Sequence, residues 1–210
     1  MSTSFLKLAG VELWHITPAE NLPSIRILGL LRPVKMAELA EVNPRELRLR
    51  QDPVKLNLDG PRARLPHQQA LLAGQGLDFL DPGVTLDQWA MVLEKRIFLW
   101  PAGQGKSFKE SLGVPAATIR LKSETLLRMY GPSMDLSPIV SGMARLNPAR
   151  RGEWMYVPAS DAEKFPKNRQ RLGIVKGDDS VAEVSLRTDL TAASLSWALA
   201  APLPTGPDPD

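Results

Sequence analysis

The chain has 210 residues, of which 43% are hydrophobic and 23% are charged, as in an ordinary globular protein. It has no cysteine, which excludes disulfides, thiolate zinc sites and cysteine nucleophiles, and its two histidines argue against a histidine-rich metal site. The net charge of +3 is by itself a weak indication of nucleic-acid binding. No apolar run is long enough to span a membrane, and the first ten residues make a poor signal peptide, so we expect a cytoplasmic protein without a membrane partner.

The first predicted element is a strand over residues 11–17, which contains one of the two histidines. Side chains of a strand alternate between its two faces, so His15 and Thr17 point the same way. Two interpretations follow: the pair belongs to a buried polar cluster, or it faces a pocket.

Two helix starts compete directly after this strand. Thr17 with Glu20 forms the pattern of a capping box, but that helix would enclose Pro23, at a cost of roughly 3 kcal/mol. A cap contributes only about 1 kcal/mol, so the later start wins. We expect Asn21 to cap a helix that has Pro23 in its first turn and ends at Gly29.

The remaining predicted elements mix strands and short helices without regular alternation. Helices are expected after the cap Asn43, over residues 86–94 behind a capping box at Thr85, over residues 123–130, and from the cap Thr191 to Leu199. Strands are expected over residues 96–100, 117–121, 154–157 and 181–186. The pattern predicts an α+β fold in a single domain over residues 1–200, followed by a disordered, proline-rich tail over residues 201–210.

Basic residues gather in two stretches. Residues 164–176 contain no acid and carry five bases: Lys164, Lys167, Arg169, Arg171 and Lys176. A second group is diluted by nearby acids and consists of Arg45, Arg48, Arg50, Arg62 and Arg64. Such clusters can follow the phosphates of a nucleic acid, or they can form an ordinary solvated surface.

Several segments together resemble a known family. The run from His15-Ile-Thr17 through Asn21-Leu-Pro-Ser-Ile25 to Gly29-Leu-Leu31 is similar to the opening of the DarT-type DNA ADP-ribosyltransferase toxins. Residues 181–186, VAEVSL, resemble the strand that carries their catalytic glutamate. Between these ends the chain looks closer to a related uncharacterised bacterial family, through the segments RIFLW (96–100), VSG (140–142) and RGEWMY (151–156).

The resemblance implies an ADP-ribosyltransferase-like fold, in which short helices surround a split β-sheet core and NAD lies in the cleft as a substrate. When the roles of the family's residues are transferred to the matching positions of this chain, His15 and Thr17 are the residues that bind the nucleotide. Arg50 contacts the diphosphate and the substrate, with Arg48 close enough to take that cofactor-binding role instead. Glu183 becomes the catalytic glutamate, and no metal is required.

These residue types suit the chemistry that the resemblance implies. Cleavage of the nicotinamide–ribose bond builds positive charge on the sugar, which a carboxylate stabilises, and the same carboxylate can accept a proton from the attacking group. A forked arginine suits a diphosphate, and an imidazole and a hydroxyl suit ribose. The same residues also suit plain structural roles: a core histidine, a solvent-facing Glu183 and a surface base at Arg50.

The function expected from the sequence is therefore NAD-dependent ADP-ribosyl transfer, a glycosyltransferase reaction, to a nucleic acid such as single-stranded DNA. Lys164, Lys167, Arg169 and Arg171 are the candidate nucleic-acid contacts. By analogy with the toxins, a toxin or defence role with an antitoxin partner follows. The alternatives are a protein or RNA acceptor, hydrolysis of NAD, an inactive module that binds NAD or nucleic acid, and a nucleic-acid-binding protein without a nucleotide pocket.

Overall fold

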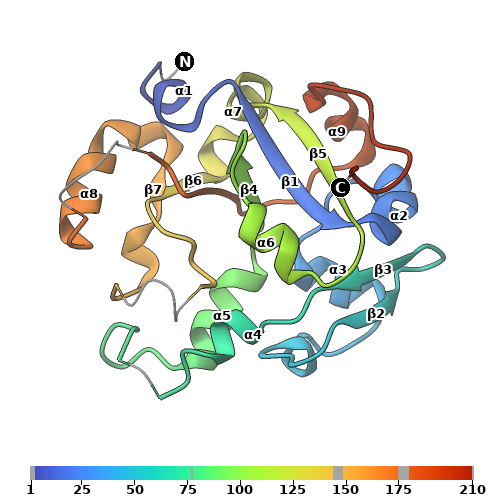
Figure 1. The fold of residues 1–210 in the computed structure, drawn as a ribbon, viewed down its shortest axis with the longest axis horizontal. Coiled ribbons are helices and arrows are strands. Elements are labelled where there is room, and N and C mark those ends of the chain that lie inside the picture. The colour runs from blue at the N-terminus through green and yellow to red at the C-terminus, as the bar shows by residue number, and fades with distance from the viewer. Residues whose placement is uncertain (1–2, 77, 144–148, 175–179, 210) are drawn as a thin grey trace.

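The structure, a computed structural model, describes residues 3–76, 78–143, 149–174 and 180–209. Within these residues the main sheet has six antiparallel strands in the order β5-β1-β4-β8-β6-β7 (Figure 1). These strands are β1 (Glu12–Pro18), β4 (Ile97–Pro101), β5 (Ala116–Lys122), β6 (Met134–Ser137), β7 (Val157–Pro158) and β8 (Glu183–Leu186). The combination of this sheet with short helices confirms the predicted α+β class.

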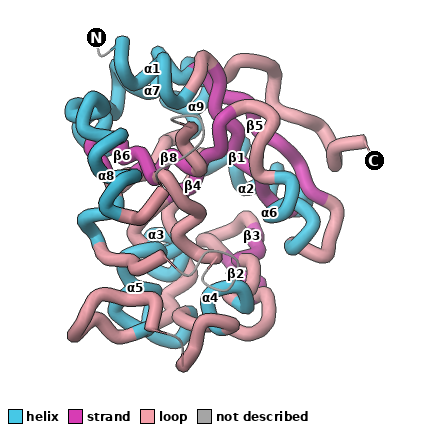
Figure 2. The backbone as a smooth tube through the Cα atoms, turned by 60° about the vertical axis from the view of Figure 1, so that its left-hand side comes forward, coloured by secondary structure: helices cyan, strands magenta, loops and turns pink. Residues whose placement is uncertain are grey.

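A separate hairpin, β2 (Val54–Asn57) and β3 (Arg62–Leu65), has a small core of its own with α3 (Pro33–Leu39). Figure 2 shows this hairpin on one side of the main sheet together with α3, α4 (Gln69–Leu72) and α5 (Leu86–Glu94). The remaining α-helices are α1 (Thr3–Ala9), α2 (Leu22–Leu28), α6 (Lys106–Ser111), α7 (Ser123–Tyr130), α8 (Phe165–Arg171) and α9 (Ala192–Ala198). The largest core packs side chains of α1, α2, α7, α8 and α9 against the main sheet.

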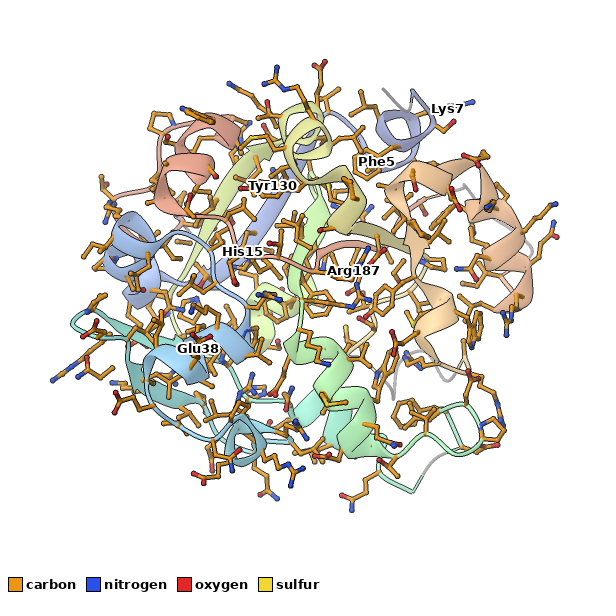
Figure 3. The ribbon with its side chains drawn as sticks, turned by 180° about the vertical axis from the view of Figure 1, so that it is seen from behind. Phe5, Lys7, His15, Glu38, Tyr130 and Arg187 are labelled. Atoms are coloured by element: carbon orange, nitrogen blue, oxygen red, sulfur yellow. The ribbon has the colours of Figure 1, made fainter. Side chains whose placement is uncertain are left out.

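The main sheet opens between two of its central strands. All seven residues of β1 pair with β5, whereas the described pairing of β1 with β4 is confined to Leu13 and Trp14. The other part of β4, from Ile97 to Leu99, pairs with β8 instead. The two strands therefore part at His15, which lies near the centre of the molecule when it is viewed from behind (Figure 3).

Local signals predicted α2, α5, α7 and α9, whereas α1, α3, α4, α6 and α8 were not predicted. Thr85 and Gln88 form the expected capping box of α5, with the Gln88 amide donating to Thr85 Oγ1 at 3.2 Å and the Thr85 amide donating to Gln88 Oε1 at 2.7 Å. Thr191 caps α9 through the amide of Ser194, and Asn43 caps a 3-10 turn, Pro44–Leu47. These caps act within a few residues, so the sequence alone indicates them.

The helix after β1 begins and ends as predicted, but the role of Asn21 differs. Gly29 ends α2 with φ of 88°, and a Cβ there would lie 1.9 Å from the carbonyl oxygen of Leu190. Asn21 stands at the N-cap position without donating or accepting a side-chain cap bond. Its amide group is instead used in contacts to distant strands, which a local pattern does not reveal.

The strand predicted over residues 154–157 is wrong for most of its length. Glu153–Met155 is a 3-10 turn, and only Val157–Pro158 of this stretch pairs within the described sheet. The ring of Tyr156 stacks on Trp89 of α5, with ring centroids 6.1 Å apart. An apolar run bounded by turns fits a strand and a packed turn equally well, so periodicity could not separate them.

The prediction of a disordered tail over residues 201–210 is also wrong for the part that the structure describes. The Asp208 amide donates to the Ala116 carbonyl at 2.7 Å, and its carboxylate accepts from the amide and hydroxyl of Thr118 and pairs with Lys109. The tail thus lies against β5, the edge strand of the main sheet. Its proline-rich composition predicted disorder because main-chain contacts leave no compositional signal.

Candidate functional site

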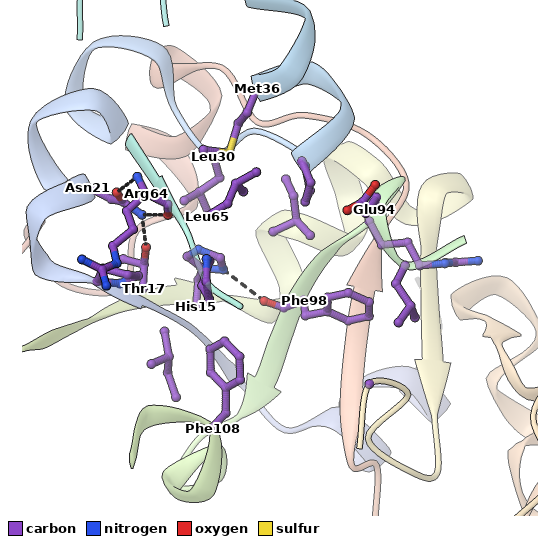
Figure 4. A pocket seen from close by; sticks show the side chains of 18 of the residues that line it. His15, Thr17, Asn21, Leu30, Met36, Arg64, Leu65, Glu94, Phe98 and Phe108 are labelled. Carbon is purple, nitrogen blue, oxygen red and sulfur yellow. Dashed lines mark hydrogen bonds between the residues drawn. The ribbon is translucent and has the colours of Figure 1, made fainter. Parts of the chain in front are cut away.

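A cavity of about 280 Å³ lies between the parting strands and the β2–β3 hairpin (Figure 4). Its wall includes His15 and Thr17 from β1, Arg50 from the segment before β2, and Glu183 from the start of β8. These are four of the five residues predicted to bind NAD or act on it. The fold therefore brings together side chains that lie far apart in the sequence.

His15 presents a neutral ring to the cavity. Its Nδ1 lies 3.0 Å from the carbonyl oxygen of Phe98, and a carbonyl only accepts, so Nδ1 carries the hydrogen (Figure 4). Burial lowers the pKa of His15, and the bond to Phe98 opposes that effect only in part. The neutral tautomer with hydrogen on Nδ1 leaves Nε2 as an acceptor, for example for a ribose hydroxyl.

Thr17 belongs to a buried polar cluster and also lines the cavity. His15 lines the cavity but bonds to Phe98, so the two residues share the pocket and not the cluster. Asn21 Nδ2 donates to Thr17 Oγ1 and to the carbonyl oxygen of Arg64, each at 3.0 Å. Asn21 Oδ1 accepts from the Arg64 amide at 2.6 Å. One side chain thus ties β1, the start of α2 and β3 together.

Arg50 is held inside the protein by an ion pair. Its Nη1 donates to Glu94 Oε1 at 2.8 Å and to the carbonyl oxygen of Leu47 at 2.7 Å, and its Nε donates to the carbonyl oxygen of Pro66. Burial lowers the pKa of Arg50 and raises the pKa of Glu94, while each partner opposes the effect on the other. The positive charge of Arg50 is therefore balanced by a buried carboxylate.

Arg48, the other arginine predicted to bind NAD, lies beside the cavity instead of in its wall. Its Nη1 donates to Asp87 at 3.0 Å, and its Nε lies 3.9 Å from a carboxylate oxygen of Glu94. This places Arg48 behind the Arg50–Glu94 pair. The sequence left open which of the two arginines contacts NAD, and of the two only Arg50 lines the cavity.

Glu183 is a buried carboxyl in the cavity wall, with 2% of its surface exposed, and not a solvent-facing residue. Its Oε1 accepts from the amide of Ser141 at 3.1 Å and from the Ser141 hydroxyl. Burial raises the pKa of Glu183 to about 7, against the opposing effects of Ser141, Arg96 and Arg151. Near neutral pH the group is therefore poised between its two protonation states, as is common at functional sites.

A family of unknown function, DUF7002, matches residues 11–196, a span that includes the whole of the predicted site. The chain belongs to this family. The chain matches none of the curated proteins and none of the solved structures.

Two arginines of this DUF7002 member, Arg96 in the cavity wall and Arg151 outside it, act electrostatically on Glu183, and neither was predicted to have a role. Arg96 donates to Asp135 and, at 2.9 Å, to Ser185 Oγ. Arg151 has no exposed surface, and its Nη atoms donate to two main-chain carbonyls. Burial lowers its pKa to about 10, and the negative charge of Glu183 opposes that effect.

Glu94 and the contact made by Ser141 were not predicted from the sequence either. Glu94 was the last residue of a predicted helix, and an acid beside the buried Leu93 at a helix end is a weak signal by itself. Ser141 and Arg151 both lay in segments that carried the resemblance, VSG and RGEWMY, so their positions were flagged although their contacts were not.

The predicted nucleic-acid contacts lie on or next to α8 and do not line the cavity. Lys164 is exposed and pairs with Asp161 at 2.6 Å, and Lys167 is exposed. Lys176, from the same basic stretch, lies outside the described residues.

The two arginines of α8 have different environments. Arg171 is exposed and stacks on Trp154, with its guanidinium carbon 3.9 Å from the ring centroid. Arg169 is buried, with 6% of its surface exposed, which does not fit the predicted role at a surface. The charge available to a strand of DNA on α8 is therefore smaller than the sequence indicated.

In the part of the chain that the structure describes, no helix is long and apolar enough to cross a membrane. No group of three or more histidine, aspartate or glutamate side chains in that part is placed to hold a metal ion.

Proposed function

We propose that this protein is an NAD-dependent ADP-ribosyltransferase with an ADP-ribosyltransferase-like fold, and that its acceptor is a nucleic acid. The observation that carries the proposal is that His15 and Glu183 line one cavity where β1 parts from β4. A neutral imidazole and a buried carboxyl with a pKa of about 7 suit the binding and cleavage of a nucleotide glycoside.

The proposed reaction uses Glu183 twice. The bond between ribose C1′ and the nicotinamide nitrogen breaks, and its electron pair leaves with nicotinamide. Ionised Glu183 stabilises the positive charge that develops on the ribose. The acceptor then bonds to C1′ through an N–H or O–H group, whose proton passes to the carboxylate.

The cavity is small for the whole of NAD. Its volume of about 280 Å³ lies just below the range of roughly 300–1,000 Å³ that is typical of ligand pockets. Much of its wall is apolar, which suits a planar ring, with His15, Thr17 and Glu183 as the polar groups that orient a sugar. We therefore expect part of the dinucleotide to lie outside the cavity.

The acceptor is the less constrained part of the proposal. Exposed Lys167 and Arg171 on α8 and the net charge of +3 support a nucleic acid, with single-stranded DNA as the first candidate. A toxin or defence role, an antitoxin partner and a cytoplasmic location belong to the same proposal.

A second candidate is a module that binds NAD or nucleic acid without turnover. Two contacts favour it: Ser141 donates twice to Glu183, and Glu94 neutralises Arg50. Both functional groups are thus already engaged within the protein.

Release of nicotinamide from NAD distinguishes the two candidates. The wild type and Glu183→Gln are assayed alone and with single-stranded DNA, duplex DNA, RNA or protein, and Glu124→Gln, on the exposed side of α7, is the matched control. We expect single-stranded DNA to stimulate release by the wild type and the control, and Glu183→Gln to lose release but keep NAD affinity. Binding of NAD without release under any condition would favour the module, and release that no acceptor stimulates would indicate hydrolysis.

A further inference from the structure

Three arginines line the cavity within the described residues, and they differ in how their charge is balanced. Arg50 and Arg96 have side chains that are 8% and 5% exposed, and their ion-pair partners, Glu94 and Asp135, are equally buried. Each of these two guanidinium charges is already neutralised by a buried carboxylate, so neither adds a net positive charge for an anionic ligand.

The third, Arg64, is different. Its side chain is 21% exposed, and its Nη1 donates at 3.1 Å to Glu20, a carboxylate that is 43% exposed. The other oxygen of Glu20 lies 3.9 Å from Lys55, the residue opposite Arg64 in the β2–β3 hairpin. Two cations thus share one solvent-screened carboxylate, so this end of the cavity carries an excess of positive charge.

Arg64 is also held beside the residues predicted to seat the nucleotide. Its amide and carbonyl both bond to Asn21, whose side chain also donates to Thr17 (Figure 4). The main chain of Arg64 is therefore fixed, while its guanidinium pairs with the partly exposed Glu20. A forked guanidinium on a fixed strand suits the oxygens of a phosphate group.

We infer that the anion-binding end of this cavity is at the guanidinium of Arg64, and that it contacts the diphosphate of NAD. The inference rests on the proposed function and moves the diphosphate contact from Arg50 to Arg64. Arg50 then keeps a structural role, in which it compensates Glu94 and holds the cavity wall through the carbonyls of Leu47 and Pro66.

The test is calorimetric binding of NAD, ADP-ribose and adenosine to the wild type, Arg64→Gln and Arg64→Lys. Asn21 bonds to the main chain of Arg64, so these substitutions leave that contact intact. The matched control is Arg62→Gln, an exposed arginine on the same strand that does not line the cavity. Thermal unfolding of each variant checks that the fold is kept.

We expect Arg64→Gln to weaken NAD and ADP-ribose about ten-fold or more, the effect of losing charge-assisted hydrogen bonds. The affinities of Arg64→Lys should lie between those of the wild type and Arg64→Gln, because lysine keeps the positive charge but lacks the forked guanidinium. Adenosine, which has no phosphate, should bind every variant alike, and Arg62→Gln should match the wild type.

Unchanged NAD affinity in a folded Arg64→Gln would overturn the inference while leaving the proposed transferase standing. ADP-ribose binding that depends on Arg64, in a protein that releases no nicotinamide, would support the inference and overturn the proposed activity. A wild type that binds neither NAD nor ADP-ribose would overturn both.

Discussion

At the scale of single residues, Glu183 links the stability of the protein to its proposed chemistry. Its carboxyl is buried in the cavity wall at the start of β8 and accepts two hydrogen bonds from Ser141, which do not offset the loss of water. An ionised carboxylate in such a place costs free energy, which a purely structural residue would avoid. The cost is consistent with a group kept for its reactivity.

The raised pKa predicts a specific dependence of stability on pH. In the unfolded chain Glu183 has its ordinary pKa of 4.5, and in the folded chain about 7, so its stabilising effect is complete below 4.5 and lost as pH rises through 7. The difference corresponds to roughly 3 kcal/mol. Glu183→Gln should therefore exceed the wild type in free energy of unfolding at pH 8, and this advantage should shrink at pH 5. Urea unfolding at both pH values measures it, and an equal difference at both would contradict the assigned pKa.

At the scale of elements, one buried side chain, that of Asn21, links the β2–β3 hairpin to β1. Asn21 makes three hydrogen bonds, two of them to the main chain of Arg64 and one to Thr17. These contacts fix the positions of β1 and β3, which both line the cavity, relative to each other.

We predict that Asn21→Ala destabilises the protein by roughly 2 to 3 kcal/mol, because buried partners lose their hydrogen bonds. Hydrogen exchange at the Arg64 amide should accelerate more than exchange in β5. The control is Asn43→Ala, which removes an exposed cap and should cost about 1 kcal/mol. Equal losses in the two variants would refute the special role of Asn21.

Local features of the fold could be predicted from the sequence, whereas contacts between distant segments could not. The caps at Thr85 and Thr191 were predictable because each acts within three residues. His15, Thr17 and Glu183 were identified through resemblance, and their shared cavity depends on strand order, which no local pattern encodes. Asn21 bonds to Arg64, which is 43 residues away in the chain. Its residue type and its position before α2 predicted only a helix cap.

At the scale of the whole molecule, the tail protects the edge of the main sheet. Strand β5 stands at the end of the strand order, and the tail bonds to it through the Asp208 amide and carboxylate. An uncovered edge strand exposes main-chain groups that pair with other chains. The tail thus limits association through β5.

Deletion of residues 202–210 should therefore lower the melting temperature and promote self-association. Asp208→Asn should have a smaller effect, because the main-chain bond to Ala116 remains. Thermal unfolding and size-exclusion chromatography with light scattering measure both properties. A truncated protein that stays monomeric with an unchanged melting temperature would show that the tail is dispensable.

The pH dependence of nicotinamide release shows whether the buried carboxyl of Glu183 acts on NAD. If the ionised form is active, release by the wild type should rise with pH through about 7, and Glu183→Gln should show no such rise. Release that persists in Glu183→Gln with the same pH profile, or NAD that fails to bind the wild type, would contradict the account.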